Sequence, residues 1–300
     1  MVAALKVLLT GASGFVGQSV LELLAKEGIE TVVAGRKLPQ GFSASNFLQT
    51  DFLGSVDFDE LVKSSGSTHL MHLAWYAEHG KYWTSHLNLR WVDATVRLAE
   101  AFCRAGGQSI IMAGTCAEYD WSYGYCNEQH TPLNPVTLYG IAKNATRHLV
   151  SAVCAEHRIP FAWGRIFLPY GPGENRNRLI PALVDVFDGV RAPFGVNATA
   201  YRDFLHIEDV ANGFLTLLKN VATGEFNVCS GQPLKIADLV KHIALLRDAD
   251  SKIILDLSSE RTGEPTILVG NNQKLLNLGW KVEREIMPCY FGNQKGPKIL

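Results

Sequence analysis

Short apolar runs alternate with amphipathic stretches along about the first 165 residues of the chain. Six runs have the length and composition of buried β-strands, at residues 5–10, 30–34, 47–50, 68–73, 109–113 and 161–166. Between them, apolar side chains recur at helical spacing, as in Phe15, Val16, Val20, Leu23 and Leu24 and again in Val92, Val96, Ala99 and Phe102. This alternation predicts an α/β fold, a doubly wound parallel sheet with helices on both faces and ligands at the carboxyl ends of its strands.

The sequence pattern changes from Pro169 onward, where the predicted helices and strands become shorter and glycine and proline residues interrupt them. We therefore expect a sheet domain over residues 1–165 and a smaller domain over residues 166–300. Residues 205–228 read as a strand, a helix and a strand, and we expect this segment to return to the main sheet.

Composition and charge exclude several classes of protein. The 300 residues are 47% hydrophobic and 19% charged, which is typical of a globular chain, and the formal net charge of −1 gives no basic field for nucleic acid. No apolar run is long enough to span a membrane, and the N-terminus lacks a signal-peptide pattern. Six cysteines without a C-x-x-C motif suggest neither a disulfide framework nor a zinc site, so we expect a cytoplasmic protein without a metal.

A glycine-rich turn joins the first strand to the first helix. It reads Gly11-Ala12-Ser13-Gly14-Phe15-Val16-Gly17. Residues without a Cβ allow the backbone N–H groups of a helix N-terminus to approach a pyrophosphate. A turn without a ligand is the alternative, but the position between a buried strand and an amphipathic helix favours a dinucleotide, held by Gly11, Ser13, Gly14, Phe15, Val16 and Gly17.

Two cations follow the second strand, where an NAD-binding fold places an acidic residue for the ribose 2′-hydroxyl. Arg36 and Lys37 instead suit a 2′-phosphate, so NADP is favoured over NAD as the cofactor. A solvated basic turn is the alternative interpretation.

Tyr139 and Lys143 lie four residues apart, on one face of the helix before the sixth strand. Both could be ordinary surface residues, but they come just downstream of Thr115 at the end of the fifth strand. An ammonium beside a phenol favours the phenolate and brings its pKa toward neutrality, as proton transfer requires.

Together these motifs resemble extended short-chain dehydrogenases acting on nucleotide-activated sugars. The G-x-x-G-x-x-G loop, the Y-x-x-x-K pair, the R-D-F-x-H segment at 202–206 and the R-x-G-E segment at 261–264 cover the chain almost end to end. The resemblance implies that Thr115 binds the substrate oxygen, Tyr139 exchanges the proton and Lys143 also holds the nicotinamide ribose. Residues 1–165 would then bind NAD(P) and residues 166–300 the nucleotide sugar.

The resemblance implies further contacts. Cofactor contacts fall on Asp51 and Phe52 after the third strand and on Leu73 and Ala74 after the fourth, although Asp51 could equally cap its own turn. Substrate contacts fall on Trp75, Cys116, Ala117, Arg202 and Arg261. Trp75 departs from the family's H-L-A-A pattern, and it and nearby aromatic residues could line a sugar pocket or simply pack at an interface. The two arginines would meet the diphosphate, or act as structural salt-bridge partners.

The residues after Thr115 bear on the reaction. Sugar 4,6-dehydratases of the family present an Asp-Glu pair there, and this chain has Cys116-Ala117, which disfavours dehydration. A 4-ketoreductase and an NAD-dependent 4-epimerase remain, and Arg36-Lys37 favours NADPH-dependent reduction of a 4-keto-6-deoxy nucleotide sugar. The motifs also leave open a reductase of ketones or aldehydes without a nucleotide, and an inactive protein that senses the cofactor. Relatives lead us to expect a homodimer formed by helices near 87–104 and 139–157.

Overall fold

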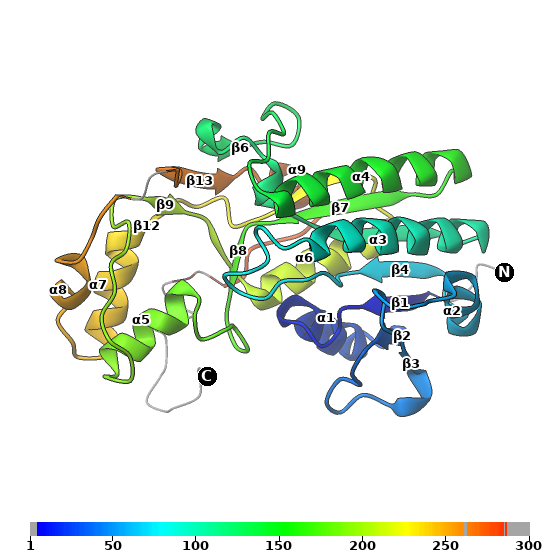
Figure 1. Cartoon of the computed structure of the whole chain (residues 1–300), viewed down its shortest axis with the longest axis horizontal. Helices are drawn as coiled ribbons and strands as arrows, with labels where there is room; N and C mark the ends of the chain where they lie inside the picture. The colour runs from blue at the N-terminus through cyan, green and yellow to red at the C-terminus, as the bar shows by residue number, and fades with distance from the viewer. Residues whose placement is uncertain (1–4, 261–262, 285, 287–300) are drawn as a thin grey trace.

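A seven-stranded, all-parallel sheet forms the centre of the computed structural model, which describes residues 5–260, 263–284 and 286. The strand order is β11-β7-β5-β4-β1-β2-β3, and β1 pairs with both β2 and β4, so the direction of winding reverses between β1 and β4. The predicted doubly wound parallel sheet is therefore confirmed (Figure 1). Its strands are β1 (Lys6–Thr10), β2 (Glu30–Gly35), β3 (Phe47–Gln49), β4 (His69–His72), β5 (Ser109–Thr115), β7 (Phe161–Ile166) and β11 (Gly224–Val228).

Helices cover both faces of this sheet. Alternate strand residues point to opposite faces, so Leu8 and Leu70 pack with α2 (Phe58–Ser65), α3 (Leu87–Arg104) and α4 (Leu138–His157). Leu9 and Met71 pack with α1 (Phe15–Lys26) and α6 (Ile207–Lys219) on the other face. Both α6 and β11 come from the second half of the chain, so this segment lies in the sheet domain.

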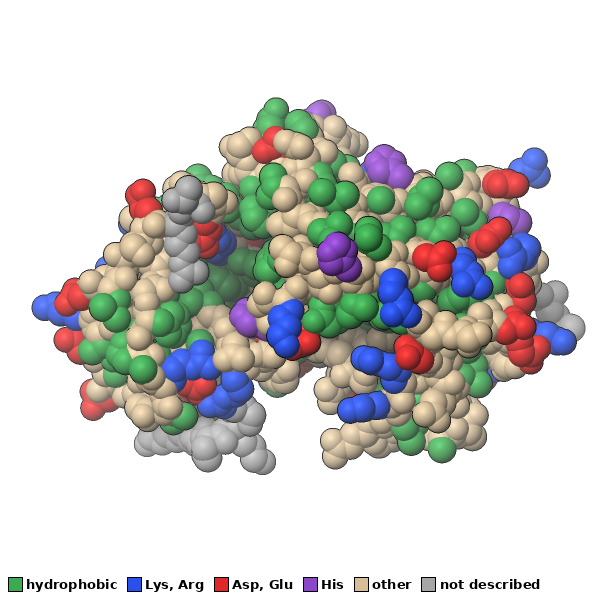
Figure 2. Space-filling model, viewed as in Figure 1, with side chains coloured by type: hydrophobic (Ala, Val, Ile, Leu, Met, Phe, Trp, Pro, Cys, Tyr) green, Lys and Arg blue, Asp and Glu red, His purple; other side chains and the backbone are tan. Residues whose placement is uncertain are grey.

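A smaller lobe lies beyond the carboxyl ends of the strands, on the left in Figure 1. It has its own apolar core around α5 (Leu179–Phe187), α7 (Ile236–Leu246) and α8 (Lys252–Leu255). Two small sheets join it to the main domain, and Figure 2 shows this face of the molecule hollowed between the two parts. Their strands are β8 (Leu168–Tyr170) with β10 (Phe204–His206), and β12 (Leu234–Lys235), β9 (Tyr201–Arg202), β13 (Ile267–Gly270) and β6 (Tyr125–Cys126).

Short helices complete the fold. They are the 3₁₀ turns η1 (Ala44–Asn46), η2 (Cys116–Glu118) and η3 (Trp121–Tyr123), and the single-turn α9 (Gln273–Leu276). Among the described residues, no helix combines the length and the apolar character that crossing a membrane requires. The same part of the chain contains no cluster of three His, Cys, Asp or Glu side chains arranged to hold a metal ion.

The aspartate of the R-D-F-x-H segment ties the lobe together. Asp203 is fully buried, and its carboxylate accepts hydrogen bonds from Ser230 N at 2.7 Å, Gly231 N at 3.0 Å and Gly270 N at 3.1 Å. Burial raises the pKa of Asp203, and these donors act in the opposite direction. Asp203 therefore joins the turn after β11 to the end of β13.

Candidate active site

The glycine turn brings three elements into close contact at the switch point of the sheet. Gly11 has a φ of +78°, and a Cβ there would lie 2.6 Å from the backbone nitrogen of Ala74. A Cβ on Gly17 would lie 2.0 Å from the carbonyl oxygen of Gly11. Any side chain at either position would push the turn away from β4 or α1.

This turn fits a dinucleotide pyrophosphate. Helix α1 begins after Gly14, no side chain caps its first N–H groups, and its first turn carries no acidic residue. Its partial positive charge is thus available to an anion, and Ser13 beside it is exposed. Phe15 and Val16, the first two residues of α1, are half-buried.

A buried histidine fixes the strand ends below the turn. The two ring nitrogens of His72 lie 2.8 Å from the hydroxyl oxygen of Thr10 and 3.0 Å from that of Thr95. Burial, followed by the charge of Lys143, lowers the pKa of His72 to about 3, so the ring is neutral near pH 7. Leu73 and Ala74 continue from this anchored position to the contact with Gly11.

The residues predicted for the adenosine end lie after β2 and β3. Arg36 and Lys37 are exposed, so their charges are open to a ligand. Asp51 accepts a hydrogen bond from Leu53 N at 3.2 Å, which is the local turn that the sequence allowed as an alternative. Phe52 is buried, and its side chain packs in the core rather than toward solvent.

Thr115 and Tyr139 meet where β5 ends and α4 begins. Thr137 caps α4 by accepting a hydrogen bond from Gly140 N at 3.1 Å. A Cβ on Gly140 would lie 2.3 Å from the carbonyl oxygen of Ala117, so the first turn of α4 rests directly on η2. The Thr115 hydroxyl lies close enough to the phenol of Tyr139 to act on its pKa as a hydrogen-bond donor.

Aromatic side chains of the loop before α3 enclose Tyr139. The rings of Tyr82 and Trp83 meet its ring edge to face, with centroids at 4.8 and 5.7 Å. Burial raises the pKa of Tyr139, while the hydrogen bond from Thr115 acts in the opposite direction. The phenol therefore remains protonated at neutral pH and can act as an acid. The expectation that Lys143 brings this pKa toward neutrality is wrong for this structure, because burial of the phenol has the larger effect.

Lys143 lies one turn further along α4 and is almost fully buried. Its ammonium donates a hydrogen bond to Ala113 O at 2.8 Å and lies 4.1 Å from the ring centroid of Trp75. Burial lowers the pKa of Lys143 to about 7, and the negative charge of Glu118 opposes this shift. The structure thus brings Thr115, Tyr139 and Lys143 together at one end of the sheet.

Trp75 lies on the Lys143 side of the site. Its indole nitrogen donates to Asn88 Oδ1 at 2.8 Å, and its ring stacks on Trp91 with centroids 6.0 Å apart. Asn88 in turn donates to the carbonyl oxygen of Tyr82 at 2.7 Å. The aromatic loop is therefore fixed as one unit against Lys143 and Tyr139.

The other residues predicted to contact substrate differ in their burial and in their partners. Cys116 and Ala117 are buried, and Cys116 packs in an apolar cluster. The Nη2 atom of Arg202 lies 2.9 Å from Glu264 Oε1, and its Nη1 atom donates to Tyr201 O, so the guanidinium has structural partners. Arg261 lies outside the described residues.

Sequence reasoning missed two charged residues near this site. Glu118 lies buried behind Thr115, although the spacing Thr-x-x-Glu is a capping-box signature that could have revealed it. Arg178 precedes α5 and pairs with Glu174 at 2.8 Å. Burial and then the charge of Arg178 lower the pKa of His79, so Arg178 faces the aromatic loop.

Comparisons with known proteins identify the family of the chain. The model of the NAD dependent epimerase/dehydratase family matches residues 7–229. The CDP-abequose synthase of Salmonella typhimurium is 27% identical over 92% of this chain and 92% of its own length. The UDP-glucose 4-epimerase of Streptomyces lividans is 25% identical over 93% of this chain and 92% of its own length.

Solved structures share the fold. The structure described as MoeE5 in complex with UDP-glucose and NAD superposes with a TM-score of 0.81 at 24% identity, covering 94% of this chain and 95% of MoeE5. The family model, the parallel sheet and the extent of the matched relatives thus agree on one classification. The chain belongs to the NAD dependent epimerase/dehydratase family and is an enzyme of the extended short-chain dehydrogenase type.

Proposed function

We propose that this enzyme reduces the keto group of a 4-keto-6-deoxy nucleotide sugar with NADPH. The observation that carries the proposal is the meeting of Thr115, Tyr139 and Lys143 beside a glycine turn that fits a dinucleotide. A nicotinamide bound there supplies the hydride.

The side chains have distinct roles in this reaction. Thr115 and Tyr139 donate hydrogen bonds to the carbonyl oxygen of the sugar, and Tyr139 transfers its proton to that oxygen as the alcohol forms. A phenol whose pKa is raised by burial is protonated at the start of each cycle, as reduction requires. The ammonium of Lys143 stabilises the phenolate that remains.

NADPH as the electron donor rests on Arg36 and Lys37, which are exposed after β2. Their two charges suit a 2′-phosphate, and Arg can bind it through two hydrogen bonds.

An NAD-dependent 4-epimerase is the second candidate, favoured by the name of the Streptomyces lividans relative and by the NAD in the MoeE5 complex. An epimerase returns the hydride, so net consumption of the reduced cofactor distinguishes the two reactions.

A 4-keto-6-deoxy nucleotide sugar should be reduced with loss of NADPH absorbance, and a 6-hydroxylated nucleotide sugar should not be dehydrated. Cys116 and Ala117 are buried and carry no acid-base pair that could expel water. Mass spectrometry of the parent sugar incubated with enzyme and NAD checks the second point. A keto sugar formed from it would overturn the assignment to reduction.

We also propose a homodimer built on α3 and α4. Leu89 on α3 and Ile141 and Leu149 on α4 are about half exposed, which leaves apolar area available for an interface. Light scattering at micromolar concentration should give twice the mass of the chain, and Leu149→Glu should shift it toward the monomer. The matched variant Leu245→Glu, at an exposed leucine of α7, should remain dimeric, whereas a monomeric wild type would contradict the proposal.

A further inference from the structure

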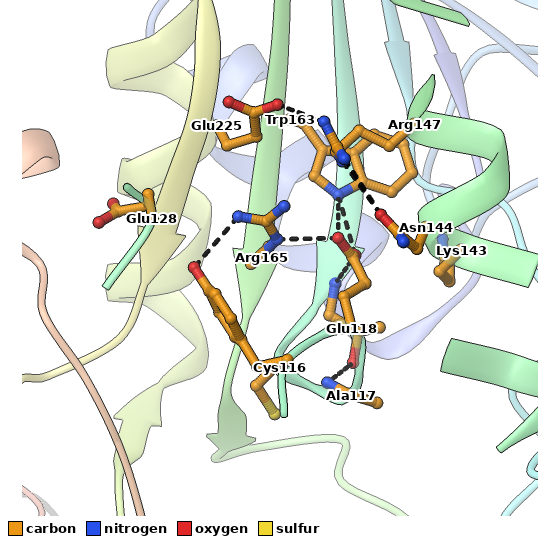
Figure 3. Close-up of polar contacts among 12 residues, drawn as sticks. Cys116, Ala117, Glu118, Glu128, Lys143, Asn144, Arg147, Trp163, Arg165 and Glu225 are labelled. Carbon is orange, nitrogen blue, oxygen red and sulfur yellow. Dashed lines mark hydrogen bonds and ion pairs between the residues drawn. The ribbon is translucent and has the colours of Figure 1, made fainter. Parts of the chain in front are cut away.

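The carboxylate of Glu118 is fully buried between the side chains of Trp163 and Arg165 (Figure 3). Glu118 Oε1 accepts hydrogen bonds from Thr115 N and from Trp163 Nε1, both at 2.9 Å. Glu118 Oε2 accepts from Arg165 Nε at 2.8 Å, and the Arg165 side chain is also buried. Donors from β5 and β7 therefore converge on one side chain of η2.

This arrangement determines how the Thr115 hydroxyl is used. Thr115 Oγ1 accepts a hydrogen bond from Ala117 N at 3.2 Å, which completes a reciprocal capping box with Glu118. Because its oxygen already accepts a backbone proton, the hydroxyl is free to donate its own proton toward Tyr139 or a substrate oxygen. The turn closed by Glu118 thus orients the hydroxyl as a donor.

The same carboxylate supplies negative charge near Lys143. Lys143 Nζ lies 5.5 Å from the ring centroid of Trp163, whose indole N–H donates to Glu118. The titratable groups around Lys143 are Glu118 from η2 with its partner Arg165 from β7, His72 from β4, and Tyr139 on α4 itself. His72 is neutral, because burial lowers its pKa. The charged side chains of α3, the helix packed along α4, are exposed: Arg90, Asp93, Arg97, Glu100 and Arg104.

We propose that Glu118 is a positioning residue for the reaction: it orients the Thr115 hydroxyl and helps to keep the buried Lys143 charged. This role rests on the proposed function of Thr115 and Lys143. The lowered pKa of Lys143, which the charge of Glu118 opposes, agrees with it. Arg165 weakens the effect of Glu118 on Lys143, because its guanidinium neutralises part of the carboxylate charge. The Nη1 atom of Arg165 also donates a hydrogen bond to the Tyr119 hydroxyl.

Two single variants should shift the pH dependence in opposite directions. Glu118→Gln removes the negative charge, so Lys143 should lose its proton at lower pH and the alkaline limb of kcat should move down by about 1 pH unit. Arg165→Met leaves Glu118 unpaired, so the limb should move up. For Glu118→Gln we also expect kcat to fall about 10- to 100-fold, with KM for the sugar little changed.

A control variant and a second readout separate this role from a structural one. Trp163→Phe removes a hydrogen bond to Glu118 but no charge, so its pH limb should stay at the wild-type position. NADPH fluorescence titration at each pH reports the charge of Lys143 without any sugar, and its midpoint should shift as kcat does. Shifts of the same sign in Glu118→Gln and Arg165→Met, or no shift in either readout, would overturn the proposal.

Loss of one partner of a buried ion pair can prevent folding. The double variant Glu118→Leu/Arg165→Met replaces the pair with apolar side chains and should keep a cooperative thermal transition. Its kcat should still fall, because Thr115 N loses its acceptor, and wild-type kcat in the folded double variant would refute the positioning role. Absence of turnover in the wild type would instead refute the proposed function, and the fluorescence midpoints would still test Glu118.

Discussion

Tyr139→Phe should lower turnover by about 10²–10⁴ while the fold and the binding of NADPH are retained, since this is the usual effect of a positioned proton donor. The ring contacts with Tyr82 and Trp83 do not need the hydroxyl, so phenylalanine should pack in the same place. Stopped-flow or steady-state measurement of NADPH oxidation with the keto sugar, together with fluorescence titration of NADPH, checks both parts.

Tyr82→Phe is the matched control, because it removes a phenol hydroxyl from the same aromatic cluster without touching the proposed proton path. Its turnover should stay within a small factor of the wild type. Near-normal turnover in Tyr139→Phe would remove Tyr139 from the role of acid.

Arg36→Ala should raise the KM for NADPH about ten- to a hundredfold and leave the KM for NADH nearly unchanged. A charge-assisted hydrogen bond contributes about 1.5–3 kcal/mol, which corresponds to this range. The maximal rate should not change, because Arg36 lies after β2 and not beside Thr115. Steady-state kinetics gives the KM and the maximal rate with NADPH and with NADH.

Lys37→Ala should have a smaller effect, because a lysine ammonium is a point charge and does not form the two parallel bonds of a guanidinium. Both effects should weaken in high salt, since the two side chains are exposed. Equal use of NADH and NADPH by the wild type, or an NAD that stays bound through purification, would favour the epimerase instead.

Much of the fold could be predicted because its signals are local. The apolar runs placed the six strands that residues 5–166 contribute to the main sheet, but not the short β6, and the 3.6-residue spacing of apolar side chains indicated its helices. The glycine turn and the Tyr139-x-x-x-Lys143 spacing are also local signals, so the sequence alone could predict a cofactor loop and a catalytic pair from them. In the structure Gly11 and Gly17 are both held in contacts that leave no room for a Cβ.

The sequence did not reveal ion pairs between residues that lie far apart along the chain. Glu118 and Arg165 form an ion pair because η2 and β7 are neighbours in the fold. The sequence of neither segment predicts that the two residues pair. For Arg202 the sequence left open a contact with the diphosphate or a structural salt bridge, and its partner Glu264 is known only from the fold. Hydrophobic periodicity locates elements, whereas polar partners inside the core depend on tertiary contacts.

The most direct test of NADPH-dependent reduction uses NADPH that carries deuterium at the transferred position. With a 4-keto-6-deoxy nucleotide sugar, each NADPH consumed should place one deuterium on C4 of the sugar alcohol, detected by mass spectrometry and NMR. Interconversion of 4-epimers without consumption of NADPH and without deuterium in the product would contradict the account.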